Sequence, residues 1–208
     1  MSGLREQKKK QNRAAIMEAA FVLFGERGYE NTSVADLAAT AGIGKGTVYS
    51  YFRSKGEILL AFCEDELTCL HLELQRTVPT DAPLEEKLLH IFMYEFRYVT
   101  KNKGFGRTLM RELIFPKELT TEKSRQIEEQ FIQFFVIMFT EAQERGQLRR
   151  DIDLTLTCGH FYALYLMSLS AWYSGRLPGE EDVRAALQVM FRQALSGLQP
   201  QKSSSNQP

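Results

Sequence analysis

Cysteine is scarce in this sequence, and its spacing argues against a disulfide-stabilised protein. Of 208 residues only three are cysteine, Cys63, Cys69 and Cys158, and no two of them form a CxxC pair. An odd count without paired spacing is not a disulfide framework, and free thiols are typical of proteins kept in a reducing compartment. We therefore expect a cytoplasmic protein.

Long apolar runs and catalytic motifs are absent as well. The longest apolar stretch, Phe131–Phe139, is interrupted by Gln133 and is too short to span a membrane. The three histidines are far apart, without the HExxH spacing of a metal site, and the sequence contains no GxSxG, P-loop or GxGxxG motif. We therefore predict no membrane span, no metal site, no cofactor and no enzymatic activity.

Neither sign of charge is in excess over the whole chain, which has 26 basic and 26 acidic residues. The charges are unevenly distributed, however. Residues 1–56 contain nine Lys or Arg and five Asp or Glu, so this segment carries +4 and the remainder carries −4. A basic N-terminal segment on an acidic body is typical of a protein that binds a polyanion such as DNA.

The segment from Ser33 to Phe52 has the pattern of two short helices joined by a tight turn. Its first part places apolar residues at i, i+3, i+4 and i+7, which predicts a helix with one apolar face: Val34, Leu37, Ala38 and Ala41. Ser33 and Asp36 have the spacing of a capping box, with Asp in place of the usual Glu or Gln. Gly42 then supplies a left-handed stop.

A second helix is predicted from Gly44 to Phe52. Val48 and Phe52 lie one turn apart and can pack on the first helix, which leaves a polar set on the other faces: Lys45, Thr47, Tyr49, Ser50 and Tyr51. One cation, several hydroxyl groups and a glycine, Gly46, that permits close approach suit contact with the phosphates and groove of DNA. The alternative is a surface helical hairpin with half-buried tyrosines.

The stretch TSVADLAATAGIGKGTVYSYFRSKGEIL resembles the DNA-binding signature of the TetR family of transcriptional regulators, and the similarity is dense from Arg13 to Leu60. The resemblance implies an N-terminal three-helix DNA-binding domain, followed by a larger all-helical domain that binds a ligand and dimerises. We accordingly expect a DNA-binding domain at residues 1–56 and a ligand-binding and dimerisation domain at residues 57–198. Residues 199–208 are rich in Ser, Gln and Pro, which predicts a disordered tail.

The DNA-binding residues implied by the resemblance lie mainly on the second of the two short helices. That helix is expected in the major groove, while Thr32 and Lys55 contact the DNA backbone and Arg13 contacts phosphate. The full predicted set is Arg13, Thr32, Ser33, Lys45, Gly46, Thr47, Tyr49, Ser50, Tyr51 and Lys55. Residues 1–10 are basic but lack apolar periodicity, so we expect a frayed arm or the solvated start of the first helix.

Apolar periodicity predicts further helices along the chain and no strand. The other expected helices cover residues 13–27, 54–76, 84–101, 105–114, 118 or 120 to 145, 151 or 153 to 172, and 180–198. Ser54 and Glu57 form a capping box at the start of the long helix 54–76, which in the family belongs to both domains. The predicted fold is therefore all-α, with about nine helices.

Aromatic residues are concentrated in the part of the chain that the resemblance assigns to ligand binding. We predict an apolar cavity there, and its ligand would be an apolar, aromatic or acyl-bearing small molecule. The predicted lining is Phe62, Glu66, Phe92, Phe96, Met110, Phe131, Phe134, Phe135, Met138 and Tyr162. For any single phenylalanine, ordinary packing in a helical core is the alternative.

The last two helices offer more apolar surface than one domain needs. We predict that they form a homodimer, in which two helices from each copy make a four-helix bundle. The predicted interface residues are Phe161, Tyr165, Ser168, Trp172, Val183, Leu187, Met190, Phe191 and Ala194. The alternative for these residues is packing against the preceding helices of the same copy.

Together these patterns predict a ligand-responsive, DNA-binding transcriptional regulator, most simply a repressor that a small apolar or aromatic inducer releases from its operator. An all-helical ligand-binding or protein-interaction protein with a vestigial helix-turn-helix is the alternative. Two further pairs of alternatives stay open: a ligand that acts as inducer or as co-repressor, and one dimer or two on each operator.

Overall fold

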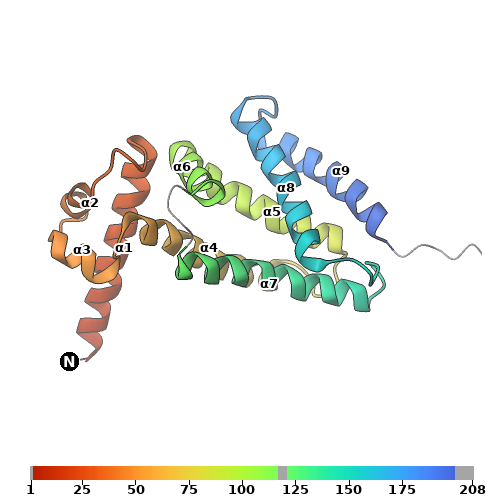
Figure 1. Cartoon of the computed structure of the whole chain (residues 1–208), viewed down its shortest axis with the longest axis horizontal. Helices are drawn as coiled ribbons and strands as arrows, with labels where there is room; N and C mark the ends of the chain where they lie inside the picture. The colour runs from red at the N-terminus through yellow and green to blue at the C-terminus, as the bar shows by residue number, and fades with distance from the viewer. Residues whose placement is uncertain (1, 117–120, 200–208) are drawn as a thin grey trace, which may run out of the picture. The chain divides into compact units, whose positions relative to one another are not determined.

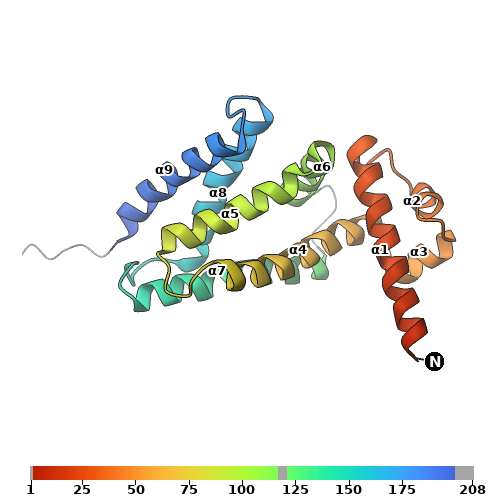
Figure 2. The same ribbon diagram turned by 180° about the vertical axis from the view of Figure 1, so that it is seen from behind.

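The computed structural model describes residues 2–116 and 121–199, and these residues form nine α-helices and no strand (Figure 1; Figure 2). The helices are α1 (Ser2–Glu26), α2 (Val34–Thr40), α3 (Lys45–Tyr51), α4 (Lys55–Thr77), α5 (Leu84–Thr100), α6 (Lys103–Ile114), α7 (Glu122–Glu144), α8 (Leu154–Tyr173) and α9 (Glu180–Leu198). The predicted all-α fold is confirmed. The predicted helix starts at 118 and 120, and the predicted disordered tail beyond Gln199, lie outside the described residues. Within those residues, no helix is long and apolar enough to cross a membrane.

The chain forms two compact units, and neither is one continuous segment. Unit 1 comprises Met1–Thr68 and Arg97–Ile127, and unit 2 comprises Cys69–Phe96 and Glu128–Pro208. Helices α4, α5 and α7 therefore contribute residues to both units. The predicted domain boundary at residue 56 is a linear division, whereas unit 1 extends beyond it and also includes α6.

Helices α1, α2 and α3 share one core in unit 1, built on the apolar face of α1. The predicted stripe on α1 is buried: Ile16, Ala19, Ala20, Leu23 and Phe24. Leu37 of α2 and Val48 of α3 are buried as well, so each short helix presents one apolar face to this core. Of the two alternatives for residues 1–10, the solvated start of the first helix applies, because α1 begins at Ser2 and its basic N-terminal half is helical and exposed.

Helix α6 packs against the C-terminal end of α1 within unit 1. The Thr108 hydroxyl donates a hydrogen bond of 3.3 Å to the carbonyl oxygen of Phe24, and the Phe105 ring centroid lies 4.9 Å from that of Phe21. A Cβ at Gly104 would lie 2.1 Å from the carbonyl oxygen of Gly25. Only a glycine fits at position 104, because the two helices meet backbone to backbone there.

The core of unit 2 is built from aromatic rings of α5, α7, α8 and α9. Phe92 of α5 lies at its centre, with ring centroids 5.6 Å from Phe135, 5.2 Å from Tyr165 and 5.3 Å from Phe191. All four rings are fully buried. Tilted arrangements at such distances add a specific attraction to the burial of apolar area.

Helix ends follow the capping signals in the sequence. The Asp153 side chain accepts a hydrogen bond of 2.9 Å from the Leu156 N–H, so α8 begins after the second of the two residues predicted. Gly42 and Gly146 have φ angles of 66° and 70°, the left-handed conformation that ends α2 and α7 as predicted.

Candidate nucleic-acid interface

Ser33 and Asp36 hold the start of α2 in a reciprocal capping box, which confirms the predicted cap. The Asp36 N–H donates to Ser33 Oγ at 3.1 Å, and the Ser33 N–H donates to Asp36 Oδ2 at 2.8 Å. The Ser33 hydroxyl also donates to this carboxylate. Because the Ser33 side chain and backbone stabilise the ionised form, they lower the pKa of Asp36 below its ordinary value. Ser33, predicted as a DNA contact, thus has its hydroxyl engaged in the cap.

A short turn connects α2 to α3 and fixes the orientation of α3. Gly42 is left-handed, and the next residue, Ile43, donates its N–H to the carbonyl oxygen of Ala38 at 3.0 Å. Helix α3 then begins after Gly44, which has no side chain for a cap. Val48 and Phe52 are buried, as predicted, so one face of α3 is anchored in unit 1.

The rest of the α3 surface includes four of the predicted DNA contacts, and all four are exposed: Lys45, Gly46, Tyr49 and Ser50. Lys45 Nζ lies 5.9 Å from the centroid of the Tyr49 ring, so the cation and the aromatic ring share one side of the helix. Ser50 Oγ donates to the carbonyl oxygen of Thr47 at 2.6 Å. A Cβ at Gly46 would meet no atom within 4 Å, so the protein itself does not require a glycine there.

The remaining predicted residues of α3, Thr47 and Tyr51, are half-buried. Tyr51 contributes to a groove of about 310 Å³ between α3 and the N-terminal half of α1. This α1–α3 groove is lined by Arg5, Lys8, Lys9, Asn12, Ser50 and Tyr51. Lys8 and Lys9 belong, with Lys10, to a basic run for which phosphate contact and simple solvation were both open from the sequence. Arg5 and Asn12 were not predicted there, although the i, i+3, i+4, i+7 spacing of the four α1 residues marks one helical face and was the available signal.

Thr32 and Lys55 donate hydrogen bonds to backbone carbonyl oxygens of the protein, and their predicted contact with the DNA backbone stays a prediction. Thr32 is 1% exposed, and its hydroxyl donates to the carbonyl oxygen of Gly28 at 2.9 Å. Lys55 Nζ donates to the carbonyl oxygen of Tyr29 at 2.6 Å and lies 4.4 Å from the centroid of the Tyr29 ring. Both side chains therefore fix the link between α1 and α2.

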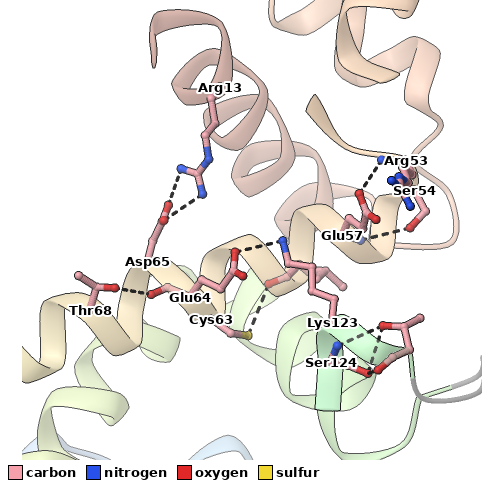
Figure 3. Close-up of polar contacts among 12 residues, drawn as sticks. Arg13, Arg53, Ser54, Glu57, Cys63, Glu64, Asp65, Thr68, Lys123 and Ser124 are labelled. Carbon is pink, nitrogen blue, oxygen red and sulfur yellow. Dashed lines mark hydrogen bonds and ion pairs between the residues drawn. The ribbon is translucent and has the colours of Figure 1, made fainter. Parts of the chain in front are cut away.

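Arg13 is paired within the protein, and its predicted contact with phosphate stays a prediction. Its guanidinium forms a bidentate ion pair with Asp65 of α4, with N–O distances of 2.8 and 2.9 Å (Figure 3). The hydrogen bond to the Asp65 side chain raises the pKa of Arg13 above its ordinary value. The preceding residue of α4, Glu64, pairs with Lys123 of α7 at 3.1 Å. These ion pairs link α4 to α1 and to the first turn of α7 in unit 1.

The predicted ligand-lining residues are divided between the two units. Phe62, Glu66 and Met110 belong to unit 1, where all three are buried. Four of the residues in unit 2 are buried in its core: Phe92, Phe96, Phe135 and Met138. The other three, Phe131, Phe134 and Tyr162, are half-buried. The common cavity stays a prediction.

The three half-buried residues and His71 form an aromatic cluster at the surface of unit 2. The Phe131 and Tyr162 ring centroids are 5.7 Å apart, and those of Phe134 and His71 are 5.8 Å apart. The two pairs are joined through the buried Phe135, whose ring centroid lies 5.0 Å from that of Phe131 and 5.5 Å from that of Phe134. Because Phe131, Phe134 and Tyr162 are only half-buried, the cluster of His71, Phe131, Phe134 and Tyr162 offers accessible apolar area. This cluster is the part of the predicted lining that a ligand can reach without displacing core side chains.

Most residues predicted for the dimer interface are buried inside unit 2. Six of them are at most 1% exposed: Phe161, Tyr165, Ser168, Val183, Leu187 and Phe191. The ring centroids of Phe161 and Phe191 lie 5.3 Å apart, so these side chains hold α8 on α9 within one copy. Residues buried in this way do not contact a second copy, and the core-packing alternative applies to them. Trp172, Met190 and Ala194 are half-buried.

Known proteins similar to this chain are regulators of transcription. Residues 16–62 match the family described as bacterial regulatory proteins, tetR family. The chain is 30% identical over 182 residues to the probable HTH-type transcriptional regulator ArpR of Pseudomonas putida, a match that covers 87% of this chain and 75% of that protein.

Two solved structures share the fold of this chain. FadR from Bacillus subtilis in complex with stearoyl-CoA is 20% identical, with a TM-score of 0.73, and the match covers 89% of this chain and 98% of that one. Thermus thermophilus FadR, a TetR-family repressor in complex with lauroyl-CoA, is 23% identical, with a TM-score of 0.70 and coverage of 94% and 100%. With the helix-turn-helix geometry of α2 and α3 and the match to ArpR, the chain belongs to the TetR family of bacterial regulatory proteins.

Proposed function

We propose that this protein is a homodimeric repressor that binds operator DNA through α3 and is released from it by an apolar, acyl-bearing ligand. The observation that carries the proposal is the exposed surface of α3, where Lys45, Tyr49 and the uncovered backbone at Gly46 are accessible while Val48 anchors the helix in the core. A helix anchored on one face and polar on the other can enter the major groove without repacking.

The composition of α3 indicates how it would recognise DNA. Its sequence, KGTVYSY, contains no Arg, Asn or Gln, the side chains that make bidentate hydrogen bonds to base edges. Much of the affinity then comes from phosphate contacts, and base discrimination depends on hydroxyl groups, apolar contacts and DNA shape. We therefore expect operator affinity to fall steeply as the salt concentration rises.

Gly46→Ala tests the DNA-binding surface directly. Position 46 is open in the free protein, and alanine is favoured over glycine inside a helix, so the variant should be more stable by about 0.5–1 kcal/mol. Its methyl group would lie where DNA approaches the backbone of α3, and a poor fit of that size typically costs about 1–3 kcal/mol. Operator affinity should therefore fall about tenfold, equivalent to about 1.4 kcal/mol.

The measurement is an anisotropy titration with a duplex that the wild-type protein selects from a random-sequence pool. Gly197→Ala in α9 is the matched control, because a Cβ there also meets no atom within 4 Å. The control should bind as the wild type does. Undiminished affinity of Gly46→Ala for the selected duplex would contradict the assignment of α3 to the DNA.

The ligand assignment rests on the aromatic cluster of unit 2 and on the acyl-CoA complexes of the two FadR proteins. A hydrocarbon chain suits half-buried aromatic rings, since it covers apolar area that water otherwise contacts. Thermal unfolding with lauroyl-CoA, stearoyl-CoA and coenzyme A alone tests this, because a ligand that binds only the folded protein raises its Tm. A shift with coenzyme A alone and none with the acyl thioesters would reject an apolar site.

Release of DNA requires that the ligand and the operator favour different arrangements of the protein. Helix α4 contributes residues to both units and begins at Lys55, shortly after α3 ends at Tyr51, so it is the element that we assign to this coupling. A coupling of about 1–3 kcal/mol would lower operator affinity roughly 5–150-fold, and DNA would weaken ligand binding by the same factor. Calorimetric titration of lauroyl-CoA into free and DNA-bound protein measures it. Equal affinities would mean no coupling, and tighter binding to the complex would make the ligand a co-repressor.

The dimer face proposed here uses the exposed residues of α8 and α9 in place of the buried ones. Leu156 and Met167 on α8 and Val189 on α9 are large apolar side chains that are 73%, 62% and 55% exposed. Gly159 and Ala163 are exposed between Leu156 and Met167 at helical spacing, so this stripe of α8 is both apolar and narrow. The family resemblance assigns a second copy of the chain to this face, which then buries the stripe about a two-fold axis.

A further inference from the structure

The α1–α3 groove brings a basic face of α1 to the C-terminal end of α3. Helix α1 extends past α3 toward the N-terminus, and its N-terminal half lies beside α3 in both views (Figure 1; Figure 2). Arg5, Lys8, Lys9 and Asn12 follow the i, i+3, i+4, i+7 spacing of one helical face, and all four line the groove. The two residues of α3 that complete the lining, Ser50 and Tyr51, each carry a hydroxyl group.

The groove is strongly positive, and its cationic side chains are exposed to solvent. Between residues 2 and 12 the chain has four cations, Arg5, Lys8, Lys9 and Lys10, and a single acidic residue, Glu6. Arg5, Lys8 and Lys9 are exposed, and none of them forms an ion pair with another described residue. This differs from Arg13, one turn further along α1, whose charge is paired with Asp65. No carboxylate lines the groove, so its field attracts an anion.

The position of the groove relates it to the DNA that α3 would bind. Helix α3 runs from Lys45 to Tyr51, a length of about 10 Å at 1.5 Å per residue. This is close to the width of the major groove, about 12 Å. When the exposed face of α3 lies in that groove, the end with Ser50 and Tyr51 lies next to one of the two sugar–phosphate backbones. The basic face of α1 then adjoins the same backbone.

We propose that the α1–α3 groove binds consecutive phosphates of the DNA strand that borders the major groove occupied by α3. Arg5, Lys8 and Lys9 supply the charge, while Asn12 and the hydroxyl groups of Ser50 and Tyr51 supply hydrogen bonds. This inference rests on the proposed function, since it needs α3 in the major groove. The groove sets the position of α3 along the duplex and strengthens binding, but it carries no base discrimination.

Lys9→Gln and Lys10→Gln are a matched pair for the test. The two positions are adjacent in α1, both substitutions remove one charge, and Lys and Gln have similar helix propensities, but only Lys9 lines the groove. For the duplex selected by the wild-type protein, the slope of log affinity against log salt falls by about 0.9 for each phosphate that the protein no longer neutralises. The magnitude of the slope should decrease by about 0.9 in Lys9→Gln. It should decrease by about 2–3 in the triple variant Arg5→Gln/Lys8→Gln/Lys9→Gln. Lys10→Gln should keep the wild-type slope to within about 0.3.

A second measurement locates the contacts on the DNA. Ethylation of single phosphates should block wild-type binding at two or three consecutive positions beside each half-site, and the triple variant should be insensitive to ethylation at those positions. The ratio of affinities for the selected duplex and a scrambled duplex should be the same for the triple variant and the wild type, because phosphate contacts are independent of sequence.

The outcomes separate this inference from the function on which it rests. A wild-type protein that selects no duplex overturns the proposed function and the groove assignment with it. A wild type that binds its duplex, with a triple variant that keeps the full salt slope and the full ethylation pattern, overturns the groove assignment alone. An equal decrease of the slope in Lys9→Gln and Lys10→Gln also overturns it, because the effect would then come from net charge and not from the groove.

Discussion

Asp36 stabilises the first turn of α2 only while its side chain is ionised. The Ser33 hydroxyl and N–H both donate to its carboxylate, and they lower its pKa in the folded protein. When the folded pKa is below the unfolded one, the stabilisation is present above the unfolded pKa and is lost as the pH falls through the folded pKa. The cap of α2, and with it the support of α3, therefore weakens in acid.

We predict that Asp36→Ala lowers the free energy of unfolding at pH 7 and that the difference from the wild type shrinks below about pH 3.9, the ordinary pKa of an aspartate. Below that pH the unfolded chain takes up the proton first. The folded carboxylate, whose pKa is lower, follows as the pH falls further, so the wild type progressively loses the hydrogen bonds that the variant lacks at every pH. Denaturant unfolding of both proteins between pH 7 and pH 3 measures the difference. A gap of constant size over this range would show that the cap does not depend on ionisation.

The exposed residues of α3 could be predicted from the sequence, but the ion pairs and hydrogen bonds that neighbouring polar residues form within the protein could not. Val48 and Phe52 fix which face of α3 is buried, and the helical period then places Gly46 and Ser50 outside. Arg13 has the same chemistry as a phosphate contact, but its partner, Asp65, is 52 residues away in the chain. Spacing along the sequence gives no signal for such a pair.

The contact between α1 and α6 depends on the absence of two side chains. Gly25 and Gly104 let the helices approach until backbone meets backbone, and Phe105 and Thr108 then reach α1 from α6. The atom nearest to a Cβ at position 104 is a carbonyl oxygen of a helix, which cannot move aside as a flexible side chain does. The helix-forming advantage of alanine is therefore reversed at this position.

We predict that Gly104→Ala destabilises the protein by about 1–3 kcal/mol, the usual penalty for overpacking. Gly46→Ala is the matched control, since the same substitution in the open face of α3 should stabilise the protein by about 0.5–1 kcal/mol. Chemical denaturation of the two variants and the wild type provides the comparison. A Gly104→Ala protein as stable as Gly46→Ala would mean that α6 can move away from α1 at little cost.

Helices could be predicted from the sequence where apolar periodicity or a capping residue indicates them. They could not be predicted with the same precision where charged residues occupy all faces of the helix. The stripe of α1 and the cap at Asp153 predicted α1 and α8 closely. The first turns of α1 were left open between a frayed arm and a solvated helix start, because residues 2–12 have nearly all polar faces and so lack apolar periodicity. The packing of α6 on α1 left no local pattern, since a glycine such as Gly104 is more often a sign of a turn.

The proposed two-fold assembly uses residues that are exposed in the single chain. Glutamate at Met167 or Val189 would place a charge in the proposed interface, where burial without a partner is unfavourable. In a single copy the same change is at the surface and should alter stability by only about 0.5 kcal/mol. The dimer equilibrium can thus be changed without unfolding the chain.

We predict that Met167→Glu/Val189→Glu weakens dimerisation at least tenfold, or about 1.4 kcal/mol. Sedimentation velocity over a concentration series measures the monomer–dimer equilibrium. Ile137→Glu is the control, because Ile137 is a comparable apolar residue, 53% exposed, on α7. A wild type that stays monomeric at micromolar concentration, or a double variant that dimerises like the control, would contradict the assigned face.

Surplus apolar residues in α8 and α9 were visible in the sequence, but their division between core and surface was not. Phe161 and Phe191 fill the core of unit 2, while Leu156 and Val189 are left outside. Both groups have the same chemistry, and only the packing partners in α5 and α7 distinguish them. The interleaving of chain segments in unit 1 was equally hidden, because the resemblance implied domains that follow one another.

The packing of α6 on α1 also sets an order of events during synthesis of the protein. A ribosome completes α1, α2 and α3 before it reaches Phe105 and Thr108, which contact Phe21 and Phe24. At roughly 5–20 residues per second, the nascent chain carries a finished α3 for several seconds before α6 exists. A chain that terminates early, between α4 and α6, therefore leaves apolar side chains of α1 uncovered. Exposed apolar surface of this kind makes such a fragment prone to aggregation and a substrate for chaperones and proteases.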